Sequence, residues 1–309
     1  MRSKITVVGA GNVGATTAHQ LAQRGYAELV LVDVQEGLPQ GKALDLDQAG
    51  AVRGHDASVI GANDYDETGG SDVVVITSGL ARKPDMSRED LLEANREIVG
   101  EVCRPVAERS PDAVVIVVTN PLDAMCHVAL QTTGFPRQRV IGMAGILDSA
   151  RLRAFLAREL GVSTAEVSAL VLGGHGDTMV PVLSSAQVAG SPVRRLLPAE
   201  RLQEVVRRTR DGGAEVVELL GSGSAFYAPA AAVVEMADAI LLDRKRLLAC
   251  TALCQGEYGI DNLFVGVPVR LGREGVEAIV EVELEDDERE QLHRSADSVR
   301  RSVEALADL

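Results

Sequence analysis

The sequence is poor in aromatic residues and in lysine. It has no tryptophan, four phenylalanines and four tyrosines, so Val, Leu, Ile and Ala must fill the core of a chain that is 46% hydrophobic. This apolar content excludes a disordered chain. Lysine occurs only at Lys4, Lys42, Lys83 and Lys245, and the formal net charge is −14 at pH 7. Because binding to nucleic-acid phosphates needs a basic patch, nucleic acid is not expected as a partner.

The acidic excess has two explanations that the sequence leaves open. In a salt-rich cytoplasm, screening by ions removes much of the repulsion between like charges, so an acidic, lysine-poor chain would suit such a cell. A bias of the genome toward arginine codons would also lower the lysine content.

Cysteine and long apolar runs are scarce as well. Cys103, Cys126, Cys250 and Cys254 lie far apart or with three residues between them, which fits neither a metal site nor a redox pair. Reduced, buried thiols of a cytoplasmic protein are the expectation. The longest apolar runs, such as residues 113–118, are far too short to cross a bilayer. No basic leader with an apolar segment precedes the first predicted strand, so we expect neither secretion nor a membrane partner.

Short apolar runs alternate with helical segments in the first half of the chain. We expect strands at residues 4–8, 28–32, 73–77, 113–119 and 140–143, and helices at residues 12–24 and 88–108. Such alternation implies right-handed crossovers and a parallel sheet covered on both faces. The sequence therefore predicts an α/β fold whose first domain, residues 1–145, is a Rossmann-type doubly wound parallel sheet.

The pattern changes after about residue 150. We expect helices at residues 149–160, 198–221 and 223–242, a strand at residues 168–172, and a final helix from Asp286. Two apolar runs, residues 263–271 and 276–284, flank a Gly-Arg-Glu-Gly turn and predict an antiparallel hairpin. These elements predict a second, α+β domain with antiparallel strands over residues 146–309.

A Gly-x-Gly-x-x-Gly turn joins the first predicted strand to the first predicted helix. Gly9, Gly11 and Gly14 allow a tight turn, the close approach of a pyrophosphate and close packing of strand and helix. The helix N-terminus at Asn12-Val13 offers free N–H groups and positive dipole charge to phosphates. Asp33 ends the second strand, where it can accept hydrogen bonds from both hydroxyls of an adenine ribose and would repel a 2′-phosphate. The cofactor predicted is NAD rather than NADP.

A histidine between glycines stands out in the second half. His175 lies within Gly173-Gly174-His175-Gly176-Asp177, and an imidazole can move a proton in both directions near neutral pH. Asp148 can form a hydrogen bond with the imidazole nitrogen that does not take part in this proton transfer. Arg151, three residues further on, can grip a carboxylate through two parallel hydrogen bonds. Together with a dinucleotide site, these groups suit hydride transfer to or from a small hydroxy acid.

Four motifs together resemble the lactate/malate dehydrogenase superfamily. They occur in that family's order and are the glycine turn of residues 9–14, Thr119-Asn120-Pro121-Leu122-Asp123, Leu147-Asp148-Ser149-Ala150-Arg151 and Gly174-His175-Gly176-Asp177. Within the superfamily, residues 80–88 and 223–229 resemble the lactate-dehydrogenase-like malate dehydrogenases. The resemblance covers essentially the whole chain.

The resemblance implies a reversible, NAD-dependent oxidation of (S)-malate to oxaloacetate, with His175 as general base and Asp148 orienting it. It also implies that a loop carrying Arg82 and Arg88 closes over the substrate, where Arg88 polarises the reacting carbonyl and Arg82 meets the distal group. A buried arginine needs a carboxylate partner, and lactate dehydrogenases usually carry glutamine at the position of Arg82, so malate is favoured. Asp85 departs from the family, which commonly has a glycine in this loop, and restricts the backbone there.

Further roles are implied by the resemblance alone. Asn95 and Val118 are placed beside the cofactor, and Asn120 is placed against both substrate and nicotinamide, although Asn120-Pro121 alone could be a simple turn. Arg151 is assigned the C1 carboxylate of the substrate. A homo-oligomer is implied, with a tetramer favoured over a dimer.

Alternative functions stay open at this point. A lactate dehydrogenase or another 2-hydroxyacid dehydrogenase would use the same chemistry on a different distal group. A short-chain dehydrogenase would need Tyr-x-x-x-Lys, and no tyrosine of the chain is followed by lysine at that spacing. A non-enzymatic NAD sensor would have the glycine turn but no use for His175, Asp148, Arg151, Arg82 and Arg88 together.

Overall fold

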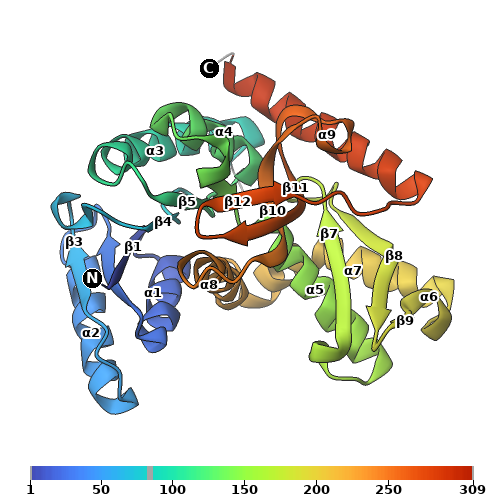
Figure 1. Cartoon of the computed structure of the whole chain (residues 1–309), viewed down its shortest axis with the longest axis horizontal. Coiled ribbons are helices and arrows are strands. Elements are labelled where there is room, and N and C mark those ends of the chain that lie inside the picture. Colours follow the sequence, from blue (N-terminus) through green and yellow to red (C-terminus); the bar gives the residue numbers. More distant parts are fainter. Residues whose placement is uncertain (1, 82–85, 308–309) are drawn as a thin grey trace.

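A long mixed sheet runs through the protein and is covered on both faces by helices (Figure 1). The computed structural model describes residues 2–81 and 86–307. The strands of this sheet are β1 (Ser3–Val8), β2 (Ala27–Val32), β3 (Val59–Ala62), β4 (Val73–Ile76), β5 (Val114–Val117), β6 (Val140–Gly142), β10 (Arg246–Gln255), β11 (Asp261–Gly272) and β12 (Gly275–Ile279). A smaller antiparallel sheet contains β7 (Val167–Leu172), β8 (Val180–Val188) and β9 (Ser191–Pro192).

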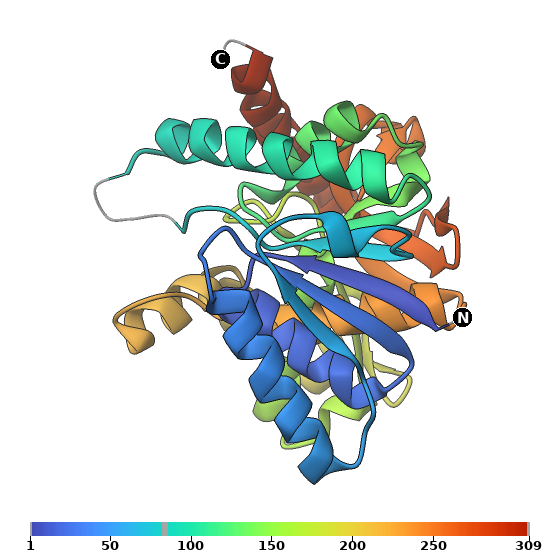
Figure 2. The same cartoon turned by 90° about the vertical axis from the view of Figure 1, so that its left-hand side faces the viewer.

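The helices surround these sheets. They are α1 (Asn12–Arg24), α2 (Leu38–Arg53), α3 (Arg88–Arg109), α4 (Leu122–Thr133), α5 (Ala144–Leu160), α6 (Val193–Leu196), α7 (Ala199–Leu220), α8 (Tyr227–Leu241) and α9 (Asp286–Ala307), with short 3-10 turns at Asp66–Thr68, Arg137–Arg139, Thr164–Glu166 and Glu257–Gly259. Figure 2 shows α1 and α2 on one side of the large sheet and α3 on the other.

The strand order of the large sheet is β12-β11-β10-β6-β5-β4-β1-β2-β3. The six strands from β1 to β6 are parallel to one another. Strands β4 and β5 consist only of buried valine and isoleucine, as expected where a parallel sheet is covered on both faces. One core lies between the sheet and α1 and α8, and the second lies between the sheet and α3 and α4.

The predicted fold class is confirmed: a Rossmann-type parallel sheet is followed by antiparallel strands. The hairpin predicted in the second half is also present, as β11 and β12. Unexpectedly, this hairpin extends the first sheet, because β10 pairs antiparallel with β6 at Thr251 and Gly142. The boundary near residue 145 stays a prediction; it falls at the start of α5, while the sheet continues across both halves.

Several predicted element boundaries were wrong. Helix α5 begins at Ala144 rather than residue 149, and Gly145 in its first turn packs against β10, where a Cβ would lie 2.8 Å from the Ala249 carbonyl oxygen. Helix α8 begins at Tyr227 rather than residue 223, because Gly223 has φ +78°. Strand β12 ends at Ile279, five residues before the predicted end. Among the described residues, no helix is long and apolar enough to span a membrane.

Candidate active site

The turn between β1 and α1 forms a cradle that needs its glycines. A Cβ on Gly14 would lie 1.8 Å from the Gly9 carbonyl oxygen, and a Cβ on Gly9 would come within 2.7 Å of the backbone after β4. In contrast, a Cβ on Gly11 would meet nothing within 4 Å, so the surface there is open. Gly11 is also the N-cap of α1 and provides no capping side chain to the first turn at Asn12-Val13. The cradle therefore has both the room and the N–H groups that a pyrophosphate needs.

Asp33 lies beside this cradle, at the carboxyl end of β2. Its Oδ2 accepts a hydrogen bond from the Ala10 N–H at 2.7 Å, and its Oδ1 accepts one from the Gln35 N–H at 2.9 Å. Lys42, which the sequence analysis did not single out, donates from Nζ to the Ala10 carbonyl at 2.5 Å. Asp33 and Lys42 thus both form hydrogen bonds with the backbone of Ala10 in the turn. A half-buried carboxylate at this edge fits an NAD ribose.

Asp148 connects the two other residues of the predicted catalytic group. Its Oδ2 lies 2.8 Å from Nδ1 of His175, and its Oδ1 accepts a hydrogen bond from NH1 of Arg151 at 3.0 Å. Only 2% of the Asp148 side chain is exposed, against 19% for His175 and 15% for Arg151. Asp148 and Arg151 lie one turn apart on α5, and His175 lies in the loop between β7 and β8. The structure therefore brings all three residues together.

The surroundings of His175 act on its pKa in opposite directions. Burial lowers the pKa, whereas the charge of Asp148, the hydrogen bond to Asp148 and the charge of Asp123 raise it; Arg151 opposes them. The net result is that the pKa of His175 is raised above the ordinary value of histidine. Such a histidine favours the imidazolium form that proton abstraction produces.

Gly173 and Gly176 have positive φ angles of +86° and +150°, which favour glycine. Gly173 exchanges two backbone hydrogen bonds with Gly266 on β11. The Gly174 N–H donates to Ser295 Oγ at 2.9 Å, and the His175 N–H donates to Asp123 Oδ2 at 3.0 Å. No role was predicted from the sequence for Ser295 or Asp123, although Asp123 belongs to the Thr119-Asn120-Pro121-Leu122-Asp123 motif.

Val118 and Asn120 follow β5, and Asn95 on α3 contacts the segments that follow β4 and β5. Asn95 is fully buried, and its amide nitrogen donates to the carbonyls of Leu80 and Asn120 at 3.1 and 2.6 Å. Its Oδ1 accepts the Leu80 N–H at 2.7 Å. Val118 is buried, whereas Asn120 is exposed. The side chain of Asn95 thus ties the start of the loop after β4 to Asn120, and direct contacts of these residues with a cofactor or substrate stay predictions.

Of the predicted loop residues, Arg82 and Asp85 lie outside the described residues. Arg88 is placed by its backbone as the first residue of α3. A capping box spans this helix start. Ser87 Oγ accepts the Asp90 N–H, and the Asp90 carboxylate accepts the Ser87 N–H, both at 3.0 Å. The capping box fixes where the helix starts, and hence where Arg88 enters it.

Two glycines inside α7 lie against the Arg151 side chain. A Cβ on Gly212 would lie 3.3 Å from Arg151 Cδ, and a Cβ on Gly213 would lie 3.6 Å from NH2. Glycine inside a helix costs about 0.5–1 kcal/mol relative to alanine. In return for this cost, the two glycines leave space for the Arg151 guanidinium beside α7.

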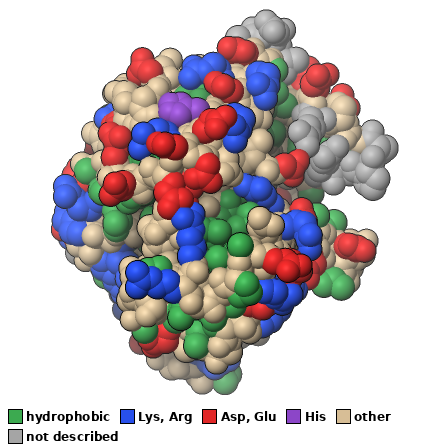
Figure 3. Space-filling view, turned by 90° about the vertical axis from the view of Figure 1, so that its right-hand side faces the viewer, with side chains coloured by type: hydrophobic (Ala, Val, Ile, Leu, Met, Phe, Trp, Pro, Cys, Tyr) green, Lys and Arg blue, Asp and Glu red, His purple; other side chains and the backbone are tan. Residues whose placement is uncertain are grey.

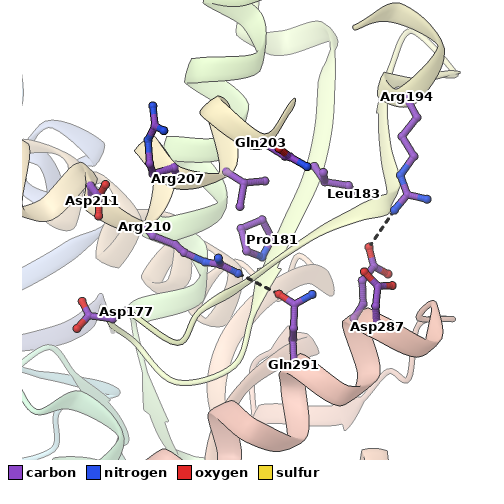
Figure 4. Close-up of a pocket in the computed structure, with 12 residues that line it drawn as sticks. Asp177, Pro181, Leu183, Arg194, Gln203, Arg207, Arg210, Asp211, Asp287 and Gln291 are labelled. Atoms are coloured by element: carbon purple, nitrogen blue, oxygen red, sulfur yellow. Dashed lines mark hydrogen bonds and ion pairs between the residues drawn. The ribbon is translucent and has the colours of Figure 1, made fainter. Parts of the chain in front are cut away.

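A separate cavity of about 530 Å³ lies between α7, β8 and α9, and Asp177 lies at its edge (Figure 4). Arg210 crosses it and donates to the Met179 carbonyl and to Gln291. Figure 3 shows acidic and basic side chains interspersed over this face of the molecule. Because the cavity contains neither His175 nor Arg151, we do not assign the substrate to it.

Comparison with known proteins agrees with this geometry. Residues 3–142 match the family described as lactate/malate dehydrogenase, NAD binding domain, and residues 146–309 match lactate/malate dehydrogenase, alpha/beta C-terminal domain. The chain belongs to the lactate/malate dehydrogenase family. The family resemblance, the enzyme class and the NAD-binding domain predicted from the sequence are thereby confirmed.

Individual relatives cover the full chain. A malate dehydrogenase of Thermomicrobium roseum is 61% identical over 100% of both chains. The crystal structure of Cryptosporidium parvum malate dehydrogenase is 46% identical, with a TM-score of 0.98 and 100% of both chains covered. A Cryptosporidium parvum lactate dehydrogenase, solved with lactic acid and nicotinamide adenine dinucleotide, is 41% identical, with a TM-score of 0.97 over 100% of this chain and 99% of that one.

Proposed function

We propose that this chain catalyses the reversible, NAD-dependent oxidation of (S)-malate to oxaloacetate. One observation carries the proposal: a buried carboxylate, Asp148, holds an imidazole at 2.8 Å and a guanidinium at 3.0 Å. A proton acceptor and a carboxylate-binding group are what a 2-hydroxy acid requires. The full-length relative from Thermomicrobium roseum carries the name malate dehydrogenase.

The reaction divides into tasks for particular atoms. Arg151 binds the C1 carboxylate, which sets the position of C2 and its hydroxyl. Asp148 keeps a proton on Nδ1 of His175, so Nε2 has the free electron pair that accepts the hydroxyl proton. The glycine turn and Asp33 would hold NAD, whose nicotinamide would supply the acceptor for the hydride that leaves C2. Asp148 then stabilises the resulting imidazolium, and in reduction the same proton returns to the substrate.

The choice between malate and lactate rests on the loop after β4, since lactate dehydrogenases share the fold. Arg82 would pair with the distal carboxylate of malate or oxaloacetate, whereas the methyl group of pyruvate would leave this arginine unpaired. Arg88 would polarise the reacting carbonyl, and Asn120 would hydrogen-bond the substrate.

Rates of NADH oxidation with oxaloacetate and with pyruvate test this assignment. The unmodified chain should prefer oxaloacetate by about 10²-fold or more, and Arg82→Gln should lose or invert that preference. Lys83→Gln, which removes the neighbouring positive charge, is the matched control and should keep it. Equal or pyruvate-favoured turnover by the unmodified chain would identify a lactate dehydrogenase instead. Tight NADH binding without turnover would identify a sensor.

We further propose a cytoplasmic homo-oligomer, with a tetramer favoured over a dimer. Large apolar side chains are exposed on three helices: Leu44 and Val52 on α2, Val217 and Leu219 on α7, and Tyr227 on α8. A second copy of the chain could cover them. Sedimentation velocity at several salt concentrations would measure the assembly, and a monomer at micromolar concentration would contradict it.

A further inference from the structure

A second buried carboxylate lies behind the backbone of the candidate base. Asp123 is the second residue of α4 and is 7% exposed. Its Oδ2 accepts the His175 N–H at 3.0 Å, and its Oδ1 accepts the hydroxyl of Thr251 at 3.0 Å. One side chain therefore joins α4, β10 and the loop that carries His175.

The loop that carries His175 packs closely against the Asp123 carboxylate. A Cβ on Gly174 would lie 3.3 Å from Asp123 Oδ2 and 2.5 Å from a methyl group of Val299 on α9. Ser295, also on α9, holds the Gly174 N–H at 2.9 Å. The backbone at His175 thus has two side-chain tethers, one charged and one neutral.

The charge of Asp123 also acts on the imidazole. Among the described residues, the charged groups with the largest effects on the ring are Asp148 and Arg151 from α5 and Asp123 from α4. Burial, and to a lesser extent the charge of Asp148, raises the pKa of Asp123, whereas the hydrogen bonds from His175 and Thr251 and the charge of His175 act against this rise. Both carboxylate oxygens accept hydrogen bonds, from the His175 N–H and from the Thr251 hydroxyl, as an ionised carboxylate does. In a buried setting, a negative charge close to an imidazole stabilises the imidazolium.

We propose that Asp123 is a positioning residue of the active site, which fixes the His175 backbone and whose negative charge stabilises the protonated imidazole. The inference rests on the proposed function, in which His175 is the base. It gives His175 two carboxylates with separate tasks: Asp148 sets the tautomer and direction of the ring, and Asp123 sets the position of the residue that carries it.

Asp123→Asn tests the inference because it keeps the size of the side chain and removes the charge. The amide oxygen can still accept the His175 N–H, and the amide nitrogen can donate to Thr251. Malate oxidation needs neutral His175, so the acidic limb of its kcat/KM profile should move to lower pH by about one unit. Oxaloacetate reduction needs protonated His175, so its alkaline limb should move in the same direction. The affinity for NADH, measured by fluorescence, should stay within twofold.

Ser295→Ala is the matched control, since it removes the neutral tether of the same loop. It should lower kcat without moving either limb of the pH profiles. If Asp123→Asn behaves like Ser295→Ala, with a lower rate and unmoved limbs, the charge has no such effect and the proposal is overturned.

A second variant covers the case in which Asp123→Asn does not fold. Thr251→Val removes one of the two donors that favour ionised Asp123, so it should shift the same limbs to lower pH by a smaller amount. The titration of His175 can also be followed without turnover, from the pH dependence of its modification by diethyl pyrocarbonate, which attacks the neutral imidazole. Unmoved titration in Thr251→Val would overturn the proposal. Failure of the proposed function would show differently, as no oxaloacetate-dependent NADH oxidation by the unmodified chain.

Discussion

Replacing Asp148 by asparagine removes the charge that links His175, the proposed base, to Arg151, which is proposed to bind the substrate. In the native site, each oxygen of this 2%-exposed side chain serves one partner: Oδ2 faces Nδ1 of His175 at 2.8 Å, and Oδ1 accepts from Arg151 at 3.0 Å. Asparagine has one acceptor oxygen and one NH₂ group. Its NH₂ group must therefore face either the N–H of Arg151 or Nδ1 of His175, where it selects the wrong tautomer.

The size of the effect follows from these two contacts. A hydrogen bond to a charged group contributes about 1.5–3 kcal/mol, so losing one and weakening the other costs about 3–5 kcal/mol in the transition state. That loss corresponds to a fall in kcat/KM of roughly 10²–10⁴-fold. The charge of Asp148 also raises the pKa of His175, so the acidic limb for malate oxidation should move to lower pH in the variant.

Steady-state rates of malate oxidation between pH 5 and pH 10 would measure both effects. Ser149→Ala is a suitable control, because this buried neighbour on α5 holds the Val171 N–H and is not hydrogen-bonded to His175. Thermal melting would show whether either variant is unfolded. Our reasoning is refuted if folded Asp148→Asn keeps kcat/KM within tenfold of the native value, or if its pH profile does not move.

Two further predictions concern packing and acid stability. Gly212→Ala places a methyl group 3.3 Å from Arg151 Cδ, so KM for malate should rise about three- to tenfold through the displaced guanidinium, while NADH affinity stays the same; an unchanged KM in kinetic assays would contradict this. Buried His127 accepts the Phe264 N–H at 3.1 Å, and burial lowers its pKa from 6.5 to about 4. As pH falls from about 6.5 to 4, the unfolded chain binds a proton that the folded one does not, so the free energy of unfolding should fall by up to about 3 kcal/mol. In urea titrations His127→Gln should lack this component, and parallel pH curves for the two proteins would argue against it.

The elements that could be predicted from the sequence are those that depend on residues close together in the chain. Buried runs of valine and isoleucine mark β4 and β5, and the glycine turn marks the start of α1. The pairing of β10 with β6 has no local signal, because it joins Thr251 to Gly142 across more than a hundred residues. The early start of α5 was missed for the same reason, since the contact that explains Gly145 comes from Ala249.

The same division applies to the candidate site. Residue types with distinctive chemistry were found from sequence, and the structure brings His175, Asp148 and Arg151 together. Residues that act on a neighbour's backbone were not assigned that role, because asparagine and aspartate are common and their partners are distant in sequence. Asn95 holds Leu80 and Asn120, and Asp123 holds His175.

The continuation of the sheet into its antiparallel part explains how His175, the proposed base, is held relative to the glycine turn between β1 and α1. Gly173, two residues before His175, exchanges two backbone hydrogen bonds with Gly266 on β11, and β11 reaches the parallel strands through β10 and β6. Asp123 adds a side-chain link between β10 and the same loop. The residues proposed to transfer the proton are thus attached to the same sheet as the glycine turn. Arg82, which is proposed to select the substrate, comes between β4 and α3 in the sequence. Substitutions at Asp148 or Asp123 should therefore move pH profiles with both oxaloacetate and pyruvate, whereas Arg82→Gln should change the ratio of the two substrates and leave the pH profile in place.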